Sequence, residues 1–186
     1  MPVSLASSAS SSTKGSLVAL GHYVADGTSA GTTFSNIPQT YQDLMLVVNG
    51  IGTRSVANDH LLMAVNTDTS SNYSYTYLQA DASAASSARG TAGAFAVMFN
   101  CLSGTLSPAG IYGSGITHIL DYTNTNKFKT MFSRGCVDLN TSGFTTITTN
   151  LYRANTNSIT NLYCITYTNL LPGSTMTLYG VRSIGQ

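Results

Sequence analysis

The side chains of this chain that could carry chemistry are few, and their spacing predicts no active centre. His22, His60 and His118 lie far apart, and no HxH or HxxxH pair would bring two imidazoles onto one metal ion. The sequence contains no Gly-x-Ser-x-Gly turn, phosphate-binding glycine loop or pair of glutamates. We therefore expect a protein that is not an enzyme and that binds no cofactor.

Two further sets of side chains could be considered as metal ligands, and neither has the pattern of a complete site. Asn66, Asp68, Ser70 and Asn72 alternate as oxygen donors, as in a calcium-binding loop, but the glycine and final glutamate of such loops are missing. The cysteines, at positions 101, 136 and 164, include no close pair, which argues against a zinc site or a disulfide framework. We expect each cysteine to be a buried, reduced thiol.

Charge is scarce along the chain. Charged residues make up 8% of the sequence, against about 25% in ordinary soluble domains, and the net charge is +1. Eight cations spread over 186 residues form no basic face, so we expect no nucleic-acid partner. A near-neutral surface offers little repulsion between copies, which favours a homo-oligomer or a subunit of a larger assembly.

The start of the chain differs from the rest in composition. Residues 1–15 are rich in serine and offer little apolar surface, so we expect a flexible N-terminal arm that becomes ordered only on a neighbouring subunit. They lack the basic start and apolar stretch of a signal peptide. No apolar run approaches the ~20 residues that span a bilayer. We expect a protein that is made in a cytoplasm and has no membrane span.

Residues 16–186 have the pattern of a single all-β domain. Runs rich in Val, Ile, Thr, Tyr and Phe recur between Gly, Ser, Asn and Pro, while Glu is absent and Lys is rare. The apolar run 43–50 predicts a strand that is buried on both faces. Tyr73, Tyr75 and Tyr77 form a stripe with the period of a strand. The pattern predicts a jelly-roll-like two-sheet antiparallel β-sandwich with an N-terminal serine-rich arm.

Three further segments carry specific expectations. Residues 82–94 and 103–115 are rich in small residues and are expected to be long surface loops. The four strand-like runs between Lys127 and Ile184 predict a closing meander of consecutive strands. The predicted core consists of the following apolar side chains: Leu44, Leu46, Leu62, Val65, Phe95, Val97, Phe99, Phe132, Ile147, Ile165 and Leu178.

Three phrases of the sequence form a recognisable set. FSNIPQTYQDLMLVV has the form F-x-x-I-P-x-T-Y-x-D-L-x-L-V, and VNTDTSSNYSY contains N-x-D-x-x-x-N-Y-x-Y. The end of the chain contains GSTMTLYGV, close to G-S-x-x-x-L-Y-G-I. Together they resemble a family of tailed-bacteriophage virion structural proteins over roughly residues 16–182. The chain departs from that family at Tyr152, where the family often has tryptophan.

The resemblance implies a jelly-roll-like sandwich located in a virion after synthesis in the host cytoplasm. We expect a tail-associated fibre or appendage component that contacts host-surface glycans. The alternative is a decoration protein that cements the capsid lattice, and a glycan depolymerase is a more distant one. The implied partners are other virion proteins and further copies of the chain, with a trimer favoured.

Four residues carry the expected contacts of this protein. Arg89 and Tyr112, one in each of the two expected loops, are the expected surface contacts, because each could form hydrogen bonds with a sugar. Tyr41 and Asp43 flank the entry to the strand 43–50, and we expect both to fix that corner of the chain.

Overall fold

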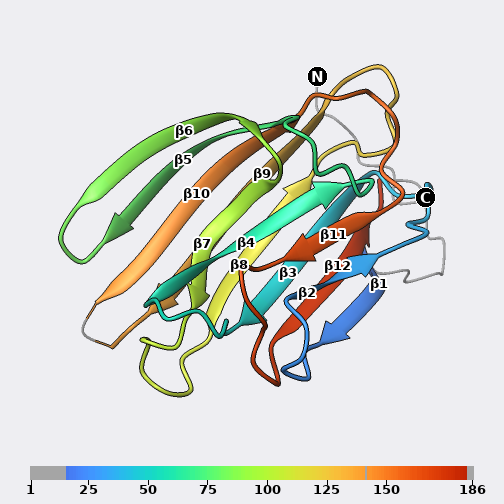
Figure 1. The fold of residues 1–186 in the computed structure, drawn as a ribbon. Helices are drawn as coiled ribbons and strands as arrows, with labels where there is room; N and C mark the ends of the chain where they lie inside the picture. Colours follow the sequence, from blue (N-terminus) through green and yellow to red (C-terminus); the bar gives the residue numbers. More distant parts are fainter. Residues whose placement is uncertain (1–15, 141, 184–186) are drawn as a thin grey trace, which may run out of the picture.

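The computed structural model describes residues 16–140 and 142–183, and every regular element in these ranges is a β-strand. Eight strands form one antiparallel sheet, in the order β1 (Leu17–Val24), β12 (Thr175–Val181), β3 (Asp43–Gly50), β8 (Gly113–Ile119), β9 (Lys129–Asp138), β10 (Gly143–Tyr152), β5 (Tyr73–Asp81) and β6 (Ala85–Gly93). Four strands form the second, in the order β2 (Gly31–Phe34), β11 (Leu162–Ile165), β4 (Asn58–Val65) and β7 (Ala96–Ser103). The predicted all-β sandwich of two antiparallel sheets is confirmed (Figure 1).

The strand order is that of a jelly roll into which two hairpins have been inserted. When the hairpins β5–β6 and β9–β10 are set aside, the first remaining strand pairs with the last, β1 with β12, and the second pairs with the second last, β2 with β11. The inner pairs are β3 with β8 and β4 with β7. Pairing of this kind folds a long two-stranded ribbon into two facing sheets. The two hairpins then extend the larger sheet beyond β8.

The core lies between the sheets and is built from alternating residues. In β3, Leu44, Leu46 and Val48 are buried, whereas Met45 and Val47 on the opposite face are only half-buried. The expectation that this strand is buried on both faces is therefore wrong, because no second layer covers its outer face within the described residues. The tyrosine stripe of β5 does share one face, with Tyr73 buried against Tyr152 at a ring-centroid distance of 5.1 Å.

The free edge of β7 is closed by side chains of β10. Asn150 is almost fully buried; its Nδ2 donates to the Val97 carbonyl at 2.8 Å, and its Oδ1 accepts from the Val97 N–H at 3.0 Å. The Asn100 N–H donates to Thr146 Oγ1 at 3.3 Å. These side chains take the hydrogen-bonding positions that a neighbouring strand would occupy, and so protect an edge that could otherwise pair with another chain.

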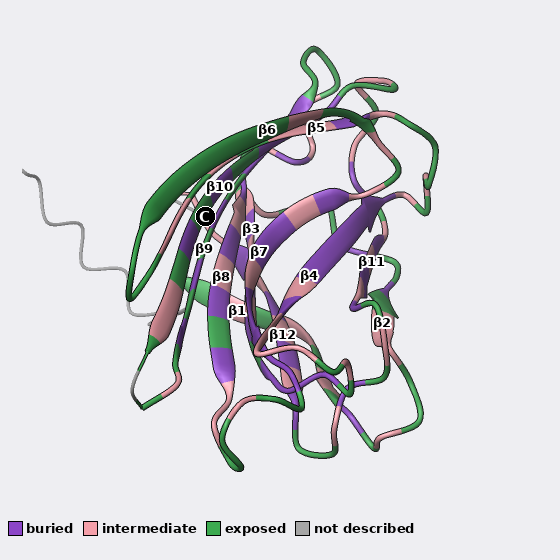
Figure 2. Ribbon diagram, turned by 60° about the vertical axis from the view of Figure 1, so that its left-hand side comes forward, coloured by how far each residue is buried: buried purple, intermediate pink, exposed green. Residues whose placement is uncertain are grey.

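Residues 82–94 do not form the long surface loop that their composition predicted. They form the turn and second strand of the β5–β6 hairpin, and β6 is exposed along most of its length (Figure 2). The Asp81 carboxylate starts the turn, because it accepts hydrogen bonds from the N–H groups of Ser83 and Ala84, each at 2.8 Å. Small residues have weak strand propensity, but Gly90 has a packing reason: a Cβ at this position would lie 2.5 Å from the Tyr75 ring and would displace it. The second expected loop, 103–115, is shorter than predicted, because β7 ends at Ser103 and β8 begins at Gly113.

The predicted closing meander is also wrong. β9 and β10 form a hairpin, but β11 lies in the four-stranded sheet, and β12 returns to the larger sheet between β1 and β3. The connections 153–161 and 166–174 cross from one sheet to the other. A sequence pattern that marks four strands does not state which sheet each strand joins.

Part of the predicted core faces outwards. Phe132 is 40% and Ile147 is 46% exposed, on the outer face of the larger sheet. In the middle of β10 the inner positions are held by polar residues, Thr146, Thr148 and Asn150, and two of these cap β7. Phe95, Val97 and Ile165 are half-buried, and the other predicted core residues are buried as expected: Leu44, Leu46, Leu62, Val65, Phe99 and Leu178.

The antiparallel arrangement sorts the loops between two ends of the molecule. Leu17 pairs with Val181, so β1 begins and β12 ends at the same end, which we call the terminal end. The turn 82–84 and the loop 104–112 lie at the opposite, distal end (Figure 1). The expected N-terminal arm, 1–15, lies outside the described residues. Those residues include no helix that is long and apolar enough to cross a membrane.

Candidate functional site

The outer face of the eight-stranded sheet carries two parallel rows of side chains, each of which crosses five strands. The polar row consists of residues that the strand register places side by side: His118, Phe132, Thr149, Thr76 and Arg89. The next row towards the distal end, called here the apolar row, consists of Ile116, Arg134, Ile147, Leu78 and Ser87. Leu78 is 60% exposed, so this row presents apolar surface to solvent.

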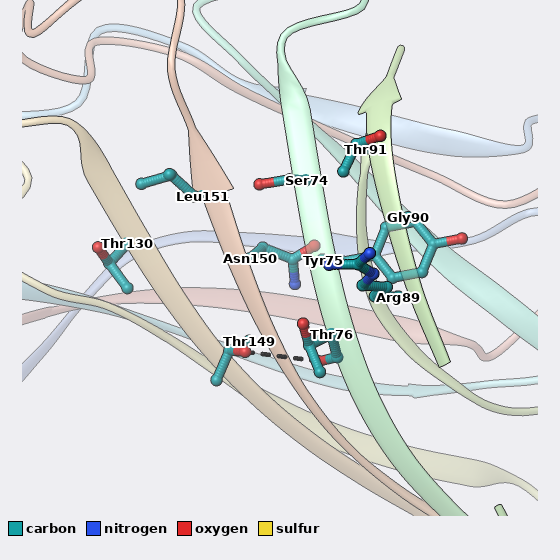
Figure 3. A pocket seen from close by; sticks show the side chains of 10 residues that line it. All are labelled: Ser74, Tyr75, Thr76, Arg89, Gly90, Thr91, Thr130, Thr149, Asn150 and Leu151. Carbon is teal, nitrogen blue, oxygen red and sulfur yellow. Dashed lines mark hydrogen bonds between the residues drawn. The ribbon is translucent and has the colours of Figure 1, made fainter. Parts of the chain in front are cut away.

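A shallow hollow of about 430 Å³ lies at the β6 end of the polar row (Figure 3). Its lining includes hydroxyl groups from three strands, those of Thr130, Thr149, Thr76 and Ser74, together with the guanidinium of Arg89. The only hydrogen bond drawn among the lining residues joins the Thr149 hydroxyl to the Thr76 carbonyl, at 3.4 Å. The hollow is therefore rich in exposed groups that can form hydrogen bonds with a ligand.

The structure separates the two residues expected to contact a ligand together. Arg89 lies in the middle of β6 and lines the hollow on the outer face. Tyr112 lies in the 104–112 loop at the distal end, where its hydroxyl donates to the Pro172 carbonyl at 3.3 Å. Tyr112 thus links two loops of the distal end and is not part of the Arg89 hollow.

The two residues expected at the corner before β3 make contacts of a structural kind. The Asp43 carboxylate accepts a hydrogen bond from the Asp121 N–H at 2.6 Å and so joins the start of β3 to the end of β8. The Tyr41 ring lies over Gly180, where an added Cβ would approach it to 2.5 Å. Tyr122 donates from its hydroxyl to the Pro38 carbonyl in the same corner. The corner role of Tyr41 and Asp43 remains a prediction that these contacts support.

The segment that resembles a calcium loop uses its oxygens within the protein. The Asp68 carboxylate accepts hydrogen bonds from the Ser70 N–H, the Asn72 amide and the Tyr152 hydroxyl, at 2.8, 2.8 and 2.9 Å. The side-chain Oδ1 of Asn66 accepts from the N–H of Thr160 at 2.8 Å. Since these oxygens already have donors, the segment is a hydrogen-bonded junction between the β4–β5 and β10–β11 connections.

This junction predicts a loss of stability in acid. The Ser70 N–H, with smaller contributions from Asn72 and Tyr152, lowers the pKa of Asp68 below its ordinary value of 3.8. A carboxylate with a lowered folded-state pKa contributes stability above its ordinary pKa, and this contribution is lost as the pH falls through the lower value. We expect the free energy of unfolding to decrease below about pH 4, and Asp68→Asn to reduce that decrease. Urea unfolding of the wild-type protein and of Asp68→Asn, measured above and below about pH 4, tests both expectations. Identical dependence of stability on pH in the two proteins would contradict the prediction.

The cysteines and other possible metal ligands do not gather into a centre. Over the described ranges, no three side chains of His, Cys, Asp or Glu lie close enough together to hold a metal ion. Cys101 and Cys164 are buried, and burial raises the pKa of their thiols to about 11 and about 12, so both are protonated at neutral pH. Cys136 is exposed on β9, which corrects the expectation that all three are buried.

Neither a known protein family, nor a curated protein, nor a solved structure matches this chain. The residues themselves must therefore support any functional assignment.

Sequence reasoning selected Arg89 but missed its neighbours in the polar row. Phe132, Thr149 and Thr76 are separated in the sequence and meet only through the register of four strands. The alternation of β10 carried a usable signal: threonines 146 and 148 and Asn150 occupy one face, and Ile147, Thr149 and Leu151 occupy the other. The usual rule that apolar positions face inwards gives the opposite orientation, since Ile147 and Thr149 are the exposed positions.

Proposed function

We propose that this chain is a non-enzymatic structural protein of a bacteriophage virion, in a tail-associated fibre or appendage that contacts the host surface. The observation that carries the proposal is the polar row, an exposed track of hydroxyl, aromatic and guanidinium groups on a rigid sheet. The jelly-roll order and the phrases that resemble virion proteins support the setting. A shallow surface of this kind binds weakly at one site, and a homo-oligomer, with a trimer favoured, would raise the overall affinity through effective concentration.

A capsid decoration protein is the second candidate, and the apolar row favours it. Ile147 and Leu78 expose apolar area in neighbouring strands, which is typical of a surface that another protein covers. A net charge of +1 would permit close packing among virion subunits.

The two roles are separated by the surface to which the purified protein binds. We expect the oligomer to adsorb to whole host cells and to compete with infection. Binding to bare capsids, with no adsorption to cells and no competition, would favour the decoration role. In that case, removal of the protein should lower the resistance of particles to heat.

The N-terminal arm supplies a further prediction about assembly. Deletion of residues 2–14 should leave the melting temperature of the domain nearly unchanged, because we expect the arm to become ordered only on a neighbouring subunit. The same deletion should reduce incorporation into particles. Thermal unfolding and the protein content of purified virions measure the two effects, and a large drop in melting temperature would show that the arm packs on its own domain.

A further inference from the structure

We propose that the polar row binds a polysaccharide that carries oxyanions, and that Arg89 recognises the negative charge. The inference rests on the proposed host-contact function and names the ligand class of the same surface. Carboxylate groups of uronic acids and phosphodiesters of teichoic-type polymers share this chemistry, because both present paired oxygens to a guanidinium.

The shape of the row suits a linear polymer that lies across the strands. Five strands at a spacing of about 4.8 Å give the row a length of about 19 Å. Phe132, which is 40% exposed, offers aromatic surface that the C–H groups of a sugar can cover. Beyond it, Thr149 and Thr76 offer hydroxyls that can both donate to and accept from sugar hydroxyls.

The charge of the hollow selects anionic over cationic ligands. Among the residues that line it, Arg89 is the one charged side chain, and the lining contains no carboxylate. Arg89 is exposed on β6, and no salt bridge joins it to an acidic side chain in the part of the chain that the structure describes. A guanidinium in this position can bind a ligand oxyanion through two parallel hydrogen bonds.

The hollow is less suited to a protein partner than the apolar row beside it. Its lining includes one aromatic residue, Tyr75, and one large aliphatic residue, Leu151, and its serine and threonine residues outnumber these two. Protein-binding surfaces instead concentrate apolar and aromatic groups at their centres. The apolar row, with Ile147 and Leu78 exposed, has that character, so a protein partner would be expected there.

The experiment compares single substitutions in the two rows of the full chain. Binding to immobilised polygalacturonate, poly(glycerol phosphate) and neutral dextran is measured by interferometry, with Arg89→Gln as the test and Arg134→Gln as the matched control. Arg134 is also an exposed arginine of the outer face, but it lies in the apolar row. We expect Arg89→Gln to weaken binding to an anionic polymer about tenfold, Arg89→Lys to restore part of it, and Arg134→Gln to change it less than about twofold.

Each outcome decides the proposal. Tighter binding to polygalacturonate would identify the ligand's anionic group as a carboxylate, and tighter binding to poly(glycerol phosphate) would identify it as a phosphate. Either result supports the proposal. Equal binding to dextran, equal losses in the two arginine variants, or no binding to either anionic polymer would overturn it. Adsorption of the same proteins to host cells is scored separately: if the wild-type protein and Arg89→Gln adsorb equally well, the ligand class is wrong while the host-contact function stands.

Discussion

Replacement of Asn150 by alanine should lower the free energy of unfolding by about 2–4 kcal/mol. The substitution removes both hydrogen bonds to the Val97 backbone and leaves an N–H and a carbonyl unpaired where the two sheets meet. Each unsatisfied buried polar group costs about 1–3 kcal/mol. The loss of stability should appear as a lower urea midpoint, while the slope of the free energy of unfolding against urea concentration stays unchanged.

The neighbouring residue provides the matched control. Thr149 lies on the same strand but points outwards, so Thr149→Ala should change stability by less than about 1 kcal/mol. An Asn150→Ala protein as stable as the wild type would show that the edge of β7 does not need these side-chain hydrogen bonds. Because an unprotected edge can pair with other chains, we also expect Asn150→Ala to aggregate faster on heating.

The second large effect is expected at the centre of the sandwich. Phe99 is fully buried, and its ring lies against Gly115 and Gly135; an added Cβ on Gly135 would lie 2.9 Å from the ring. Phe99→Ala should therefore leave a cavity against the backbone of β8 and β9, where Gly115 and Gly135 are paired and offer no side chain to fill it, at a cost of about 3–5 kcal/mol. Urea unfolding measures this cost.

The same chemical change at an outward position serves as the comparison. Phe132 lies on β9 with 40% of its surface exposed, so Phe132→Ala should cost less than about 1 kcal/mol. If Phe99→Ala and Phe132→Ala lowered the free energy of unfolding by similar amounts, the prediction that the buried ring matters more would be wrong. The pair also distinguishes stability from binding, because the Phe132 substitution should affect attachment to the polysaccharide more than folding.

The number and type of most strands could be predicted from the sequence, because β-branched and aromatic runs between turn residues mark them directly. β6 could not, because its Ala, Ser and Gly residues have low strand propensity, and the strand depends on pairing with β5. The sequence also could not predict which face of β10 is directed towards the core. Alternation specifies two faces, and the contact of Asn150 and Thr146 with β7 shows that the polar face is the inner one.

The candidate site was predictable only in part, for a related reason. Arg89 could be selected as an isolated cation among small residues, but its partners depend on strand register. A shift of one residue in the pairing of β10 with β5 would remove Thr149 from the row. Tyr112 was a reasonable candidate by residue type, and its actual use in joining two loops depends on the long connection between β11 and β12.

The pairing of the first strand with the last sets a condition on how the chain can fold. β1 finds its partner only when β12 is available, and the contact between His22 and Thr177 spans 155 residues. On a ribosome, β1 must therefore wait with an open edge until β12 has been made. Contacts this distant in sequence slow folding, and exposed edges in the waiting chain favour misassembly. We expect slow refolding after dilution from denaturant, and a yield that falls steeply as protein concentration rises.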